Sequence, residues 1–596
     1  MPSYHAPLRD MRFVLHELLE IENYSNLPGF EDAGADMVDA ILEEGAKLCE
    51  EVIHPINQSG DLEGCTFKDG EVTTPTGFKE AYKLYTEGGW NGLTAPAEYG
   101  GQQLPAFLGT AFAEMMSASN QSFSMYSGLT HGAIHALHAH GSDELKSTYL
   151  PNMISGQWAG TMNLTEPQCG TDLGLLRTKA DPQDDGSYKI TGTKIFISAG
   201  DHDMTENIIH LVLARIKGAP EGSNGISLFV VPKFMVNEDG SLGARNGVTC
   251  GSIEHKMGIK GSATCVLNYE DAIGYLVGEE NKGLFGMFTM MNSARLGVGL
   301  QGLALSEIAY QNAVEYTKDR RSGRSLSGAK EPDQSADPII VHPDVRRMLM
   351  TMRAFNEGAR AFALSTALKL DIHLHHPDED TRTAADDWVA LTTPVIKGFL
   401  TDYGFDSCNL GIQCFGGHGY IHEWGMEQFV RDARIAQLYE GTNGIQSLDL
   451  VGRKLAANGG RAIRAFFAEV GGFVEAHKED DQLAEFVTPV GDAINDLQQA
   501  TMWFMQNAMQ KPDNAGAGSY DYMTLFGLAA TGYMWAQMAK VATAKLAEGA
   551  EDPAFYQNKL ATARFYMERM LPDTGALLKK VESGADTLMA LDADAF

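Results

Sequence analysis

Apolar residues recur at helical spacing over two long parts of the chain, and a part with a different pattern separates them. From about residue 36 to 154 they step by three and four, as in MVDAILEEGAKLCEEVI, with one interruption at the Gly- and Pro-containing GGWNGLTAPAEYGGQQLP. Between residues 158 and 278 the pattern changes to short β-branched runs separated by turn residues: KITGTKIFIS, NIIHLVLAR, GISLFVVP and TCVLNYE. This predicts a helical domain with one long loop, followed by a small β domain.

Helical periodicity returns at Gly283 and continues to the C-terminus apart from two breaks. Val345, Met348, Met352 and Phe355 step by three and four residues, as one buried helix face requires. The segment GAKEPDQSADPIIVHP contains three prolines and cannot be helical, so it separates two helices. A second break, KPDNAGAGS, falls in the last part of the chain, which we interpret as a separate helical unit.

We therefore expect a mainly α protein with a central β domain. The expected parts are an N-terminal extension (1–35), a helical domain (36–157), a β domain (158–280), a helical bundle (281–455) and an additional helical domain (456–596). A chain of 596 residues is too long for one hydrophobic core, which agrees with several domains.

Composition narrows the classes of function. The formal charge of -32 disfavours binding to nucleic acid and to anionic lipid. No apolar run approaches the roughly 20 residues of a membrane span, and the start MPSYHAPLRDMRF does not resemble a signal peptide, so we expect a cytoplasmic protein. The seven cysteines are scattered without a CxxC pair, which predicts free thiols and no metal site. We interpret His131, His135 and His138, on one helix face, as structural.

One carboxylate is the first candidate for chemistry. In RDARIAQLYEGTNGIQ, Glu440 comes directly before Gly441 and Thr442. A carboxylate that is desolvated against a bound ligand could remove a proton from a carbon atom. The tripeptide alone is a weak signal, because many exposed turns contain it, and an isolated Glu is more often a solvated surface residue.

Two further motifs lie in the predicted β domain. NLTEPQCGTD offers the hydroxyls of Thr165 and Thr171 and the open backbone of Gly170 to a polar ligand, although Glu-Pro also favours a simple turn. In KIFISAG, strand alternation places Phe196 and Ser198 on one face, so that a ring and a hydroxyl could cover a flat cofactor. The alternative is an ordinary half-buried strand.

Two motifs in the helical part suit a phosphate. The paired glycines of QCFGGHGY allow close approach of the backbone to a ligand, or simply end a helix. Arg320 and Arg321 form a basic cluster in an acidic chain, which suits a diphosphate or a solvated helix end. No GxGxxG follows a strand and no GxxxxGK occurs, so neither a Rossmann fold nor a P-loop is predicted.

The motifs Thr-Glu-Pro, Lys-x-x-Ile-Ser, the Arg cluster, Gln-x-x-Gly-Gly and Tyr-Glu-Gly-Thr occur here in the order found in the acyl-CoA dehydrogenases. The chain resembles that family over roughly residues 36–455. The resemblance implies a helical domain, a middle β-barrel-like domain and a C-terminal four-helix bundle, with FAD bound between them. The start YHAPLRDMRFVL and the C-terminal helical extension are similar to an extended bacterial branch of the family.

The resemblance also implies the chemistry of Glu440. It matches the family's catalytic base, which takes the α-proton of an acyl-CoA while the β-hydrogen leaves as hydride to flavin N5. Burial beside the thioester and the flavin should raise its pKa by about 2 units or more. The backbone N–H of Glu440 and the ribityl 2'-hydroxyl of the flavin would bind the thioester carbonyl. Some members take the base from the residue before Arg295, but here that residue is Ala294.

The remaining residue roles follow from the same resemblance. Thr165 would meet the pyrimidine edge of the flavin, Ser198 its N5 and Phe196 its ring face. The full set implied for FAD comprises Met162, Leu164, Thr165, Gly170, Thr171, Phe196, Ser198, Arg320, Gln413, Gly416, Gly417, Thr442 and Gly444. The set implied for the substrate comprises Thr171, Arg295, Tyr439, Glu440 and Gly441. Arg320 and the Gln413 motif would reach the FAD of a neighbouring subunit, so at least a dimer is expected.

We therefore expect an FAD-dependent enzyme that oxidises a short- to medium-chain acyl-CoA to the trans-2-enoyl-CoA. The favoured substrate is 3-(methylthio)propanoyl-CoA, an intermediate in dimethylsulfoniopropionate demethylation, with straight chains from butanoyl- to octanoyl-CoA as the close alternative. The expected electron acceptor is electron-transferring flavoprotein, and the expected assembly is a homodimer. The alternatives are an acyl-CoA oxidase and, from another class, a DNA-binding relative.

Overall fold

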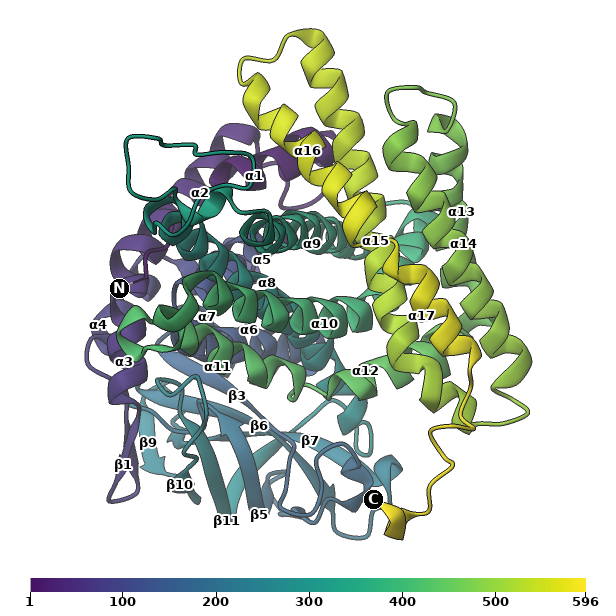
Figure 1. Cartoon of the computed structure of the whole chain (residues 1–596). Coiled ribbons are helices and arrows are strands. Elements are labelled where there is room, and N and C mark those ends of the chain that lie inside the picture. Colours follow the sequence, from purple (N-terminus) through teal and green to yellow (C-terminus); the bar gives the residue numbers. More distant parts are fainter. Residues whose placement is uncertain (1) are drawn as a thin grey trace. The chain divides into compact units, whose positions relative to one another are not determined.

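The computed structural model describes residues 2–596, which form two compact units. The first unit comprises residues 2–43, 105–114 and 298–596, and the second comprises residues 44–104 and 115–297. Three helices have residues in both units: α2 (Ala35–Leu48), α5 (Ala106–Ser119) and α8 (Gly283–Asp319). Figure 1 shows the elements along the chain.

The second unit contains a β-barrel. Its ring runs β11, β5, β4, β6, β7 and back to β11, because β7 pairs with both β6 and β11. β10 pairs with the free edge of β11, and β3 pairs with β6. The strands are β3 (Trp158–Asn163), β4 (Lys179–Pro182), β5 (Tyr188–Ser198), β6 (Asn207–Ile216), β7 (Ile226–Pro232), β10 (Val248–Ile253) and β11 (Thr264–Val277). The four strands predicted from β-branched runs are thus confirmed as β5, β6, β7 and β11.

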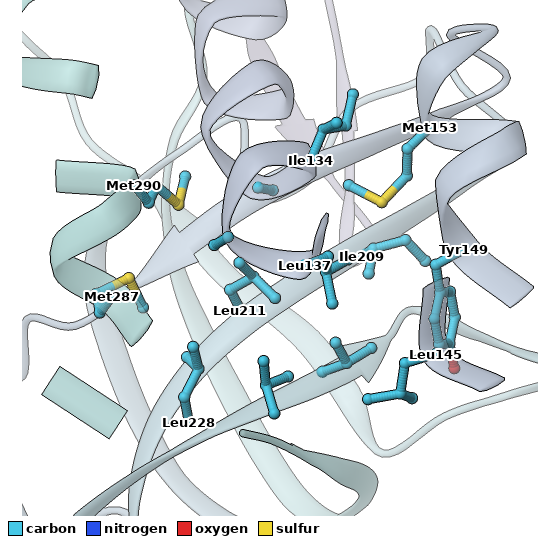
Figure 2. Close-up of a cluster of buried hydrophobic side chains, with 14 of the residues drawn as sticks. Ile134, Leu137, Leu145, Tyr149, Met153, Ile209, Leu211, Leu228, Met287 and Met290 are labelled. Atoms are coloured by element: carbon cyan, nitrogen blue, oxygen red, sulfur yellow. The ribbon is translucent and has the colours of Figure 1, made fainter. Parts of the chain in front are cut away.

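Alternate side chains of β6 and β7 enter two separate cores. On one face, Val212 and Phe229 join the cluster inside the barrel. On the other face, Leu211 and Leu228 pack against helices of the same unit (Figure 2). This second cluster includes Ile134 and Leu137 from α6 (Gln121–His140), Leu145, Tyr149 and Met153 from α7 (Asp143–Ile154), and Met287 and Met290 from α8. Because one face of β6 and β7 lines the barrel interior and the other packs against helices, nearly every residue of these strands is apolar.

The rest of the second unit consists of short elements. They are α3 (Asn57–Glu63), α4 (Phe78–Glu87), the hairpin of β1 (Thr66–Lys68) and β2 (Glu71–Thr73), and the pair β8 (Phe234–Val236) and β9 (Leu242–Arg245). Residues 88–105 contain only short turns of 3-10 helix, as their Gly and Pro content predicts.

The first unit is helical. Around the C-terminal part of α8 it contains α1 (Leu8–Arg12), α9 (Pro343–His375), α10 (Glu379–Phe415), α11 (Met426–Arg434), α12 (Asn443–Asp449), α13 (Arg461–His477), α14 (Ala484–Asn507), α15 (Asp513–Glu548), α16 (Pro553–Arg569) and α17 (Asp573–Glu582). α8 and α10 approach closely, because a Cβ on Gly302 would lie 2.2 Å from the carbonyl oxygen of Leu400. The predicted buried face of α9 is confirmed, since Met348, Met352 and Phe355 are buried and Val345 is half-buried.

The additional C-terminal domain packs on the bundle through α15. Gly527 of α15 lies against Phe399 of α10, and the Nε1 of Trp535 donates to the carbonyl of Ala354 at 3.0 Å. The long loop predicted between α8 and α9 is confirmed, but the predicted break KPDNAGAGS is wrong over most of its length. α15 already begins at Asp513, and Gly518 lies inside it against the ring of Phe504, where a larger side chain would collide. Gly518 therefore serves a helix contact instead of a turn.

Among the described residues all seven cysteines are free, and no helix is long and apolar enough to cross a membrane.

Candidate active site

Glu440 occupies a strained turn in the first unit. It has φ of 56°, in the left-handed region that non-glycine residues seldom adopt, and Gly441 follows with φ of 83°. Such a conformation costs on the order of 1–3 kcal/mol and persists only where surrounding contacts hold it. Thr442 then caps α12, because its side-chain oxygen accepts the N–H of Ile445. The turn therefore places one half-buried carboxylate between a short 3-10 turn and a helix start.

A buried lysine holds this turn from behind. Lys397, on α10, is fully buried and donates at 2.7 Å to the carbonyl of Gly441 and at 2.7 Å to Oδ1 of Asn443. Gln446 Nε2 donates to the carbonyl of Glu440 at 3.0 Å. The backbone carbonyls of both residues in the strained pair, Glu440 and Gly441, are thus fixed by side chains.

Tyr439 is held beside the turn by its hydroxyl, which donates to Gln301 of α8. Burial raises the pKa of Tyr439, and the charge of Glu440 raises it further. The phenol therefore stays neutral across the working pH range and suits an apolar contact with a ligand.

A second group of candidate residues lies in the barrel unit, at the end of β3. Glu166 accepts hydrogen bonds from Lys194 Nζ at 2.8 Å and from the backbone N–H of Arg177 at 2.7 Å. Lys194 also donates to the carbonyl of Leu164 at 2.9 Å, and the carbonyl of Thr165 accepts the N–H of Ile195 at 2.9 Å. The Thr-Glu-Pro and Lys-x-x-Ile-Ser motifs are therefore joined, and the pair Glu166 and Lys194 fixes the backbone around Thr165.

Both members of that buried pair have shifted pKa values. Burial alone would raise the pKa of Glu166, but Lys194 and several N–H and O–H donors lower it to about 2. Burial lowers the pKa of Lys194 to about 8, against the opposing effect of Glu166. The strong depression at Glu166 means that the ion pair is intact at neutral pH.

Phe196 lies at a bulge of β5. On β11, Cys265 and Leu267 are two positions apart. Their partners on β5, Ile197 and Lys194, are three positions apart, so β5 contains one extra residue. Phe196 takes up the insertion with φ of 59°, and its side chain is 59% exposed. A large ring held outward at the expense of backbone strain is typical of a ligand contact. The simple alternation expected for Phe196 and Ser198 does not describe this backbone.

The other predicted residues of the second unit lie in different environments. Met162 and Leu164 are partly buried against the core of Figure 2, whereas Gly170 and Thr171 are exposed in the loop after β3. Arg295 is buried in α8. Met287 and Met290, in the Met-rich run before it, are fully buried core residues.

Arg320 and the Gln413 motif are brought together in the first unit. Arg320 follows the end of α8, and Tyr316, one turn earlier, stacks on Phe415 with ring centroids 4.1 Å apart. Arg320, Gln413, Gly416 and Gly417 are all exposed. No described atom lies within 4 Å of the position that a Cβ on Gly416 or Gly417 would take, so the backbone is open to a ligand. An exposed guanidinium and amide beside open backbone suit a diphosphate.

Several residues of this framework were not predicted from the sequence. Lys397 carried no motif that pointed to the turn, and Asn443, although it lies in the segment RDARIAQLYEGTNGIQ, was assigned no role. The one available signal was a lone Lys inside an otherwise apolar helical run, TTPVIKGFL, because a fully buried Lys needs polar partners.

Comparison with protein families identifies the class. Acyl-CoA dehydrogenase models match the N-terminal domain over residues 37–157, the middle domain over 161–272 and the C-terminal domain over 281–455, and an acetyl-CoA dehydrogenase C-terminal-like model matches 466–592. The chain belongs to the acyl-CoA dehydrogenase family and is a flavin-dependent oxidoreductase. The expected fold, with its extra C-terminal helical domain, is confirmed.

Individual relatives cover the whole chain. It is 43% identical to 3-methylmercaptopropionyl-CoA dehydrogenase of Ruegeria pomeroyi, over 98% of this chain and 99% of that protein. It is 34% identical to a butyryl-CoA dehydrogenase of Syntrophomonas wolfei, over 100% and 99%. In fold it resembles ACDH-11 of Caenorhabditis elegans in complex with C11-CoA, with a TM-score of 0.79, 21% identity and coverage of 99% and 96%. An acyl-CoA dehydrogenase of Bacillus anthracis complexed with FAD gives a TM-score of 0.74, 21% identity and coverage of 94% and 90%.

FAD is the cofactor, and the residues present fit it. Phe196 offers an exposed ring on strained backbone, and the half-buried hydroxyls of Thr165 and Ser198 lie on segments joined by the Glu166 and Lys194 pair. Elsewhere Arg320 lies beside open glycine backbone. An apolar ring and two hydroxyls suit a flavin ring, and a guanidinium beside open backbone suits a diphosphate.

Proposed function

We propose that this enzyme dehydrogenates short- to medium-chain acyl-CoA thioesters, with 3-(methylthio)propanoyl-CoA as the preferred substrate and 3-(methylthio)acryloyl-CoA as the product. The 43% identity to 3-methylmercaptopropionyl-CoA dehydrogenase over nearly the full length of both chains carries the substrate assignment. The second candidate is butanoyl-CoA or a similar straight chain, which the 34% identity to butyryl-CoA dehydrogenase favours.

Glu440 is the proposed base for the α-proton. Its carboxylate stands on a turn whose backbone is fixed by Lys397 and Gln446, so its position is set before substrate binds. A bound acyl-CoA would exclude water from the carboxylate, and a desolvated carboxylate is a stronger base. FAD, when bound, supplies the acceptor for the hydride that leaves the β-carbon.

The backbone of the same residue serves the other half of the reaction. The N–H of Glu440 is proposed to donate to the thioester carbonyl, so that negative charge on that oxygen is stabilised as the α-proton leaves. A preorganised donor of this kind contributes about 3–4 kcal/mol in well-studied enzymes. The left-handed conformation of Glu440 therefore presents carboxylate and N–H from one residue to one substrate.

The substrate assignment is tested by kcat/KM for a panel of purified acyl-CoA thioesters. Because sulfur is nearly isosteric with methylene, discrimination is limited to about 1–3 kcal/mol, or roughly 10- to 200-fold. We expect 3-(methylthio)propanoyl-CoA to exceed butanoyl-CoA and hexanoyl-CoA. A butanoyl-CoA value more than tenfold higher would replace the first candidate by the second.

Electron-transferring flavoprotein is the proposed acceptor, in the cytoplasm. Turnover with that flavoprotein should greatly exceed peroxide formation in air, whereas rapid peroxide formation with oxygen alone would indicate an oxidase. The DNA-binding alternative conflicts with the net charge of -32, and a gel-shift assay at moderate salt should show no complex.

A homodimer is the proposed assembly, with Arg320 and Gln413 reaching the FAD of the neighbouring subunit. Arg320→Ala should purify with less FAD per chain than wild type. The matched control is Lys318→Ala, which removes an exposed cation of the same helix end that pairs with Glu315. Light scattering after gel filtration should give the mass of two chains, and a monomer that retains full FAD would contradict the assembly.

A further inference from the structure

One carboxylate accepts hydrogen bonds from both sides of the turn at Glu440 and Gly441, which we call the catalytic turn. Oδ1 of Asp402, on α10, accepts a hydrogen bond from Gln437 Nε2 at 2.7 Å and another from Asn443 Nδ2 at 2.7 Å. Gln437 precedes Glu440 by three residues, and Asn443 follows it by three. The position of Asp402 therefore determines how both ends of the turn are held.

The second oxygen of this carboxylate is bound from the additional C-terminal domain. The hydroxyl of Tyr520, on α15, donates to Oδ2 of Asp402 at 2.6 Å. Burial and the neighbouring carboxylate raise the pKa of Tyr520, so the phenol keeps its proton across the working pH range. Both oxygens of Asp402 are thus occupied, one by the turn and one by α15.

Close packing fixes α15 at this point. Met523, one helical turn after Tyr520, fills the space above Gly398 of α10, where a Cβ would lie 2.3 Å from its sulfur. The hydroxyls of Ser519 and Ser447 lie 3.1 Å apart, which joins α15 to α12. Tyr520 therefore approaches Asp402 from a helix that contacts both α10, which carries Asp402, and α12, which follows the turn.

The same set of contacts reaches the buried lysine behind the turn. Asn443 donates to Asp402 through its amide nitrogen and accepts from Lys397 through its amide oxygen. Asn443 thus links the carboxylate to the cation that holds the Gly441 carbonyl. A rotation of Asp402 would change the hydrogen bonds of Asn443 and, through Lys397, the support of the Glu440 and Gly441 backbone.

We infer that Tyr520 is a positioning residue for the reaction. It acts through Asp402, which holds the catalytic turn. The additional helical domain is therefore part of the catalytic framework. The inference rests on the proposed role of Glu440 as the base. Misplacement of a catalytic group by about 1 Å can cost about 100-fold in rate, so a partial loosening should be measurable.

The test compares Tyr520→Phe with Tyr533→Phe in the full-length, FAD-loaded enzyme. Tyr533 lies on the same helix, and its hydroxyl bonds Glu469 at 3.4 Å, outside the set of contacts described above. Two measurements are made: hydrogen exchange of the amides in residues 438–446, and the rate of flavin bleaching on mixing with saturating acyl-CoA. Asp402→Asn and the double variant with Tyr520→Phe complete a cycle.

In Tyr520→Phe we expect amide exchange in the turn to rise about tenfold and flavin bleaching to fall about tenfold, with acyl-CoA affinity changed by less than about twofold. Tyr533→Phe should match wild type in each measurement. In the Asp402→Asn background, Tyr520→Phe should have no further effect.

Unchanged amide exchange and unchanged flavin bleaching in Tyr520→Phe would overturn the inference. It would also be overturned if the effects of Tyr520→Phe and Asp402→Asn simply added in the double variant. If wild type fails to bleach with every acyl-CoA tested, the proposed function fails, while the exchange measurement still decides whether Tyr520 holds the turn.

Discussion

Arg360 offers the clearest test of how the N-terminal extension is held in the first unit. Its guanidinium is 1% exposed and donates to Glu114 at 2.6 Å, to Glu307 at 3.0 Å and to Asp10 of the extension. Asp10 also binds the buried Lys559 of α16. One guanidinium thus contacts carboxylates from α1, α5 and α8, and a second cation, Lys559, joins the additional domain to the same cluster.

Arg360→Met keeps much of the side-chain volume and removes the charge. Breaking a buried ion pair costs about 3–5 kcal/mol, because the remaining charge loses its partner in a medium of low polarity. Asp10 keeps Lys559, but Glu114 and Glu307 lose their cation. We therefore expect a loss of about 4 kcal/mol at pH 8. Arg461→Met is the control, since Arg461 is half exposed and solvent screens its ion pair with Asp387, so that its loss should change stability little.

The pH dependence has a definite sign. Burial raises the pKa of Glu114 to about 7, against a reference of 4.5, even with Arg360 present. The folded state therefore binds a proton more tightly than the unfolded state, so this group favours folding most below pH 4.5 and less as pH rises to about 7. Without Arg360 the pKa of Glu114 rises further, and the loss in Arg360→Met should be smaller at pH 6 than at pH 8.

Thermal unfolding of the FAD-loaded variants, followed by circular dichroism at one scan rate, measures these differences. A midpoint for Arg360→Met within about 1 °C of the Arg461→Met control at pH 8 would refute the reasoning, because about 4 kcal/mol corresponds to several degrees even in a large domain. A larger loss at pH 6 than at pH 8 would refute the assignment to Glu114.

Two further predictions concern the barrel unit. Lys194→Met should lower the thermal midpoint and FAD content at pH 7, because it strands the buried carboxylate of Glu166. With the pKa of Glu166 at about 2 and that of Lys194 at about 8, the wild-type pair should hold between pH 4.5 and about 8, and it should weaken as pH falls toward 2. An unchanged FAD content in Lys194→Met would contradict this role. Phe196→Gly should leave the fold at least as stable, because glycine accepts φ of 59° without strain. The same variant should retain less FAD, measured by flavin absorbance per chain. Equal retention would exclude a contact between the Phe196 ring and the flavin.

Local sequence patterns predicted elements of the fold and pointed to Glu440, the proposed base. The β-branched runs became β5, β6, β7 and β11, and the proline-rich segment became the loop between α8 and α9. Glu440 stood out because the Tyr-Glu-Gly-Thr motif is contiguous in sequence. Ala294, at the alternative base position, leaves Glu440 as the carboxylate that the family resemblance supports.

Contacts between distant segments could not be read from the sequence. Tyr520 and Asp402 are 118 residues apart, and Lys397 reaches Gly441 across 44. Phe196 adopts a bulge that alternation does not predict, because the extra residue becomes visible only when β5 is paired with β11. The glycines of KPDNAGAGS were interpreted as a break, but packing against Phe504 makes Gly518 a contact position within a helix.

Flavin bleaching in Glu440→Gln tests the central claim most directly. Glutamine keeps the shape of the side chain but cannot accept the α-proton as a base, so FAD content and acyl-CoA affinity should match wild type while the bleaching rate falls by about 100-fold or more. Glu423→Gln, at an exposed position, is the matched control and should bleach at the wild-type rate. Bleaching of Glu440→Gln within about twofold of wild type would show that Glu440 is not the base.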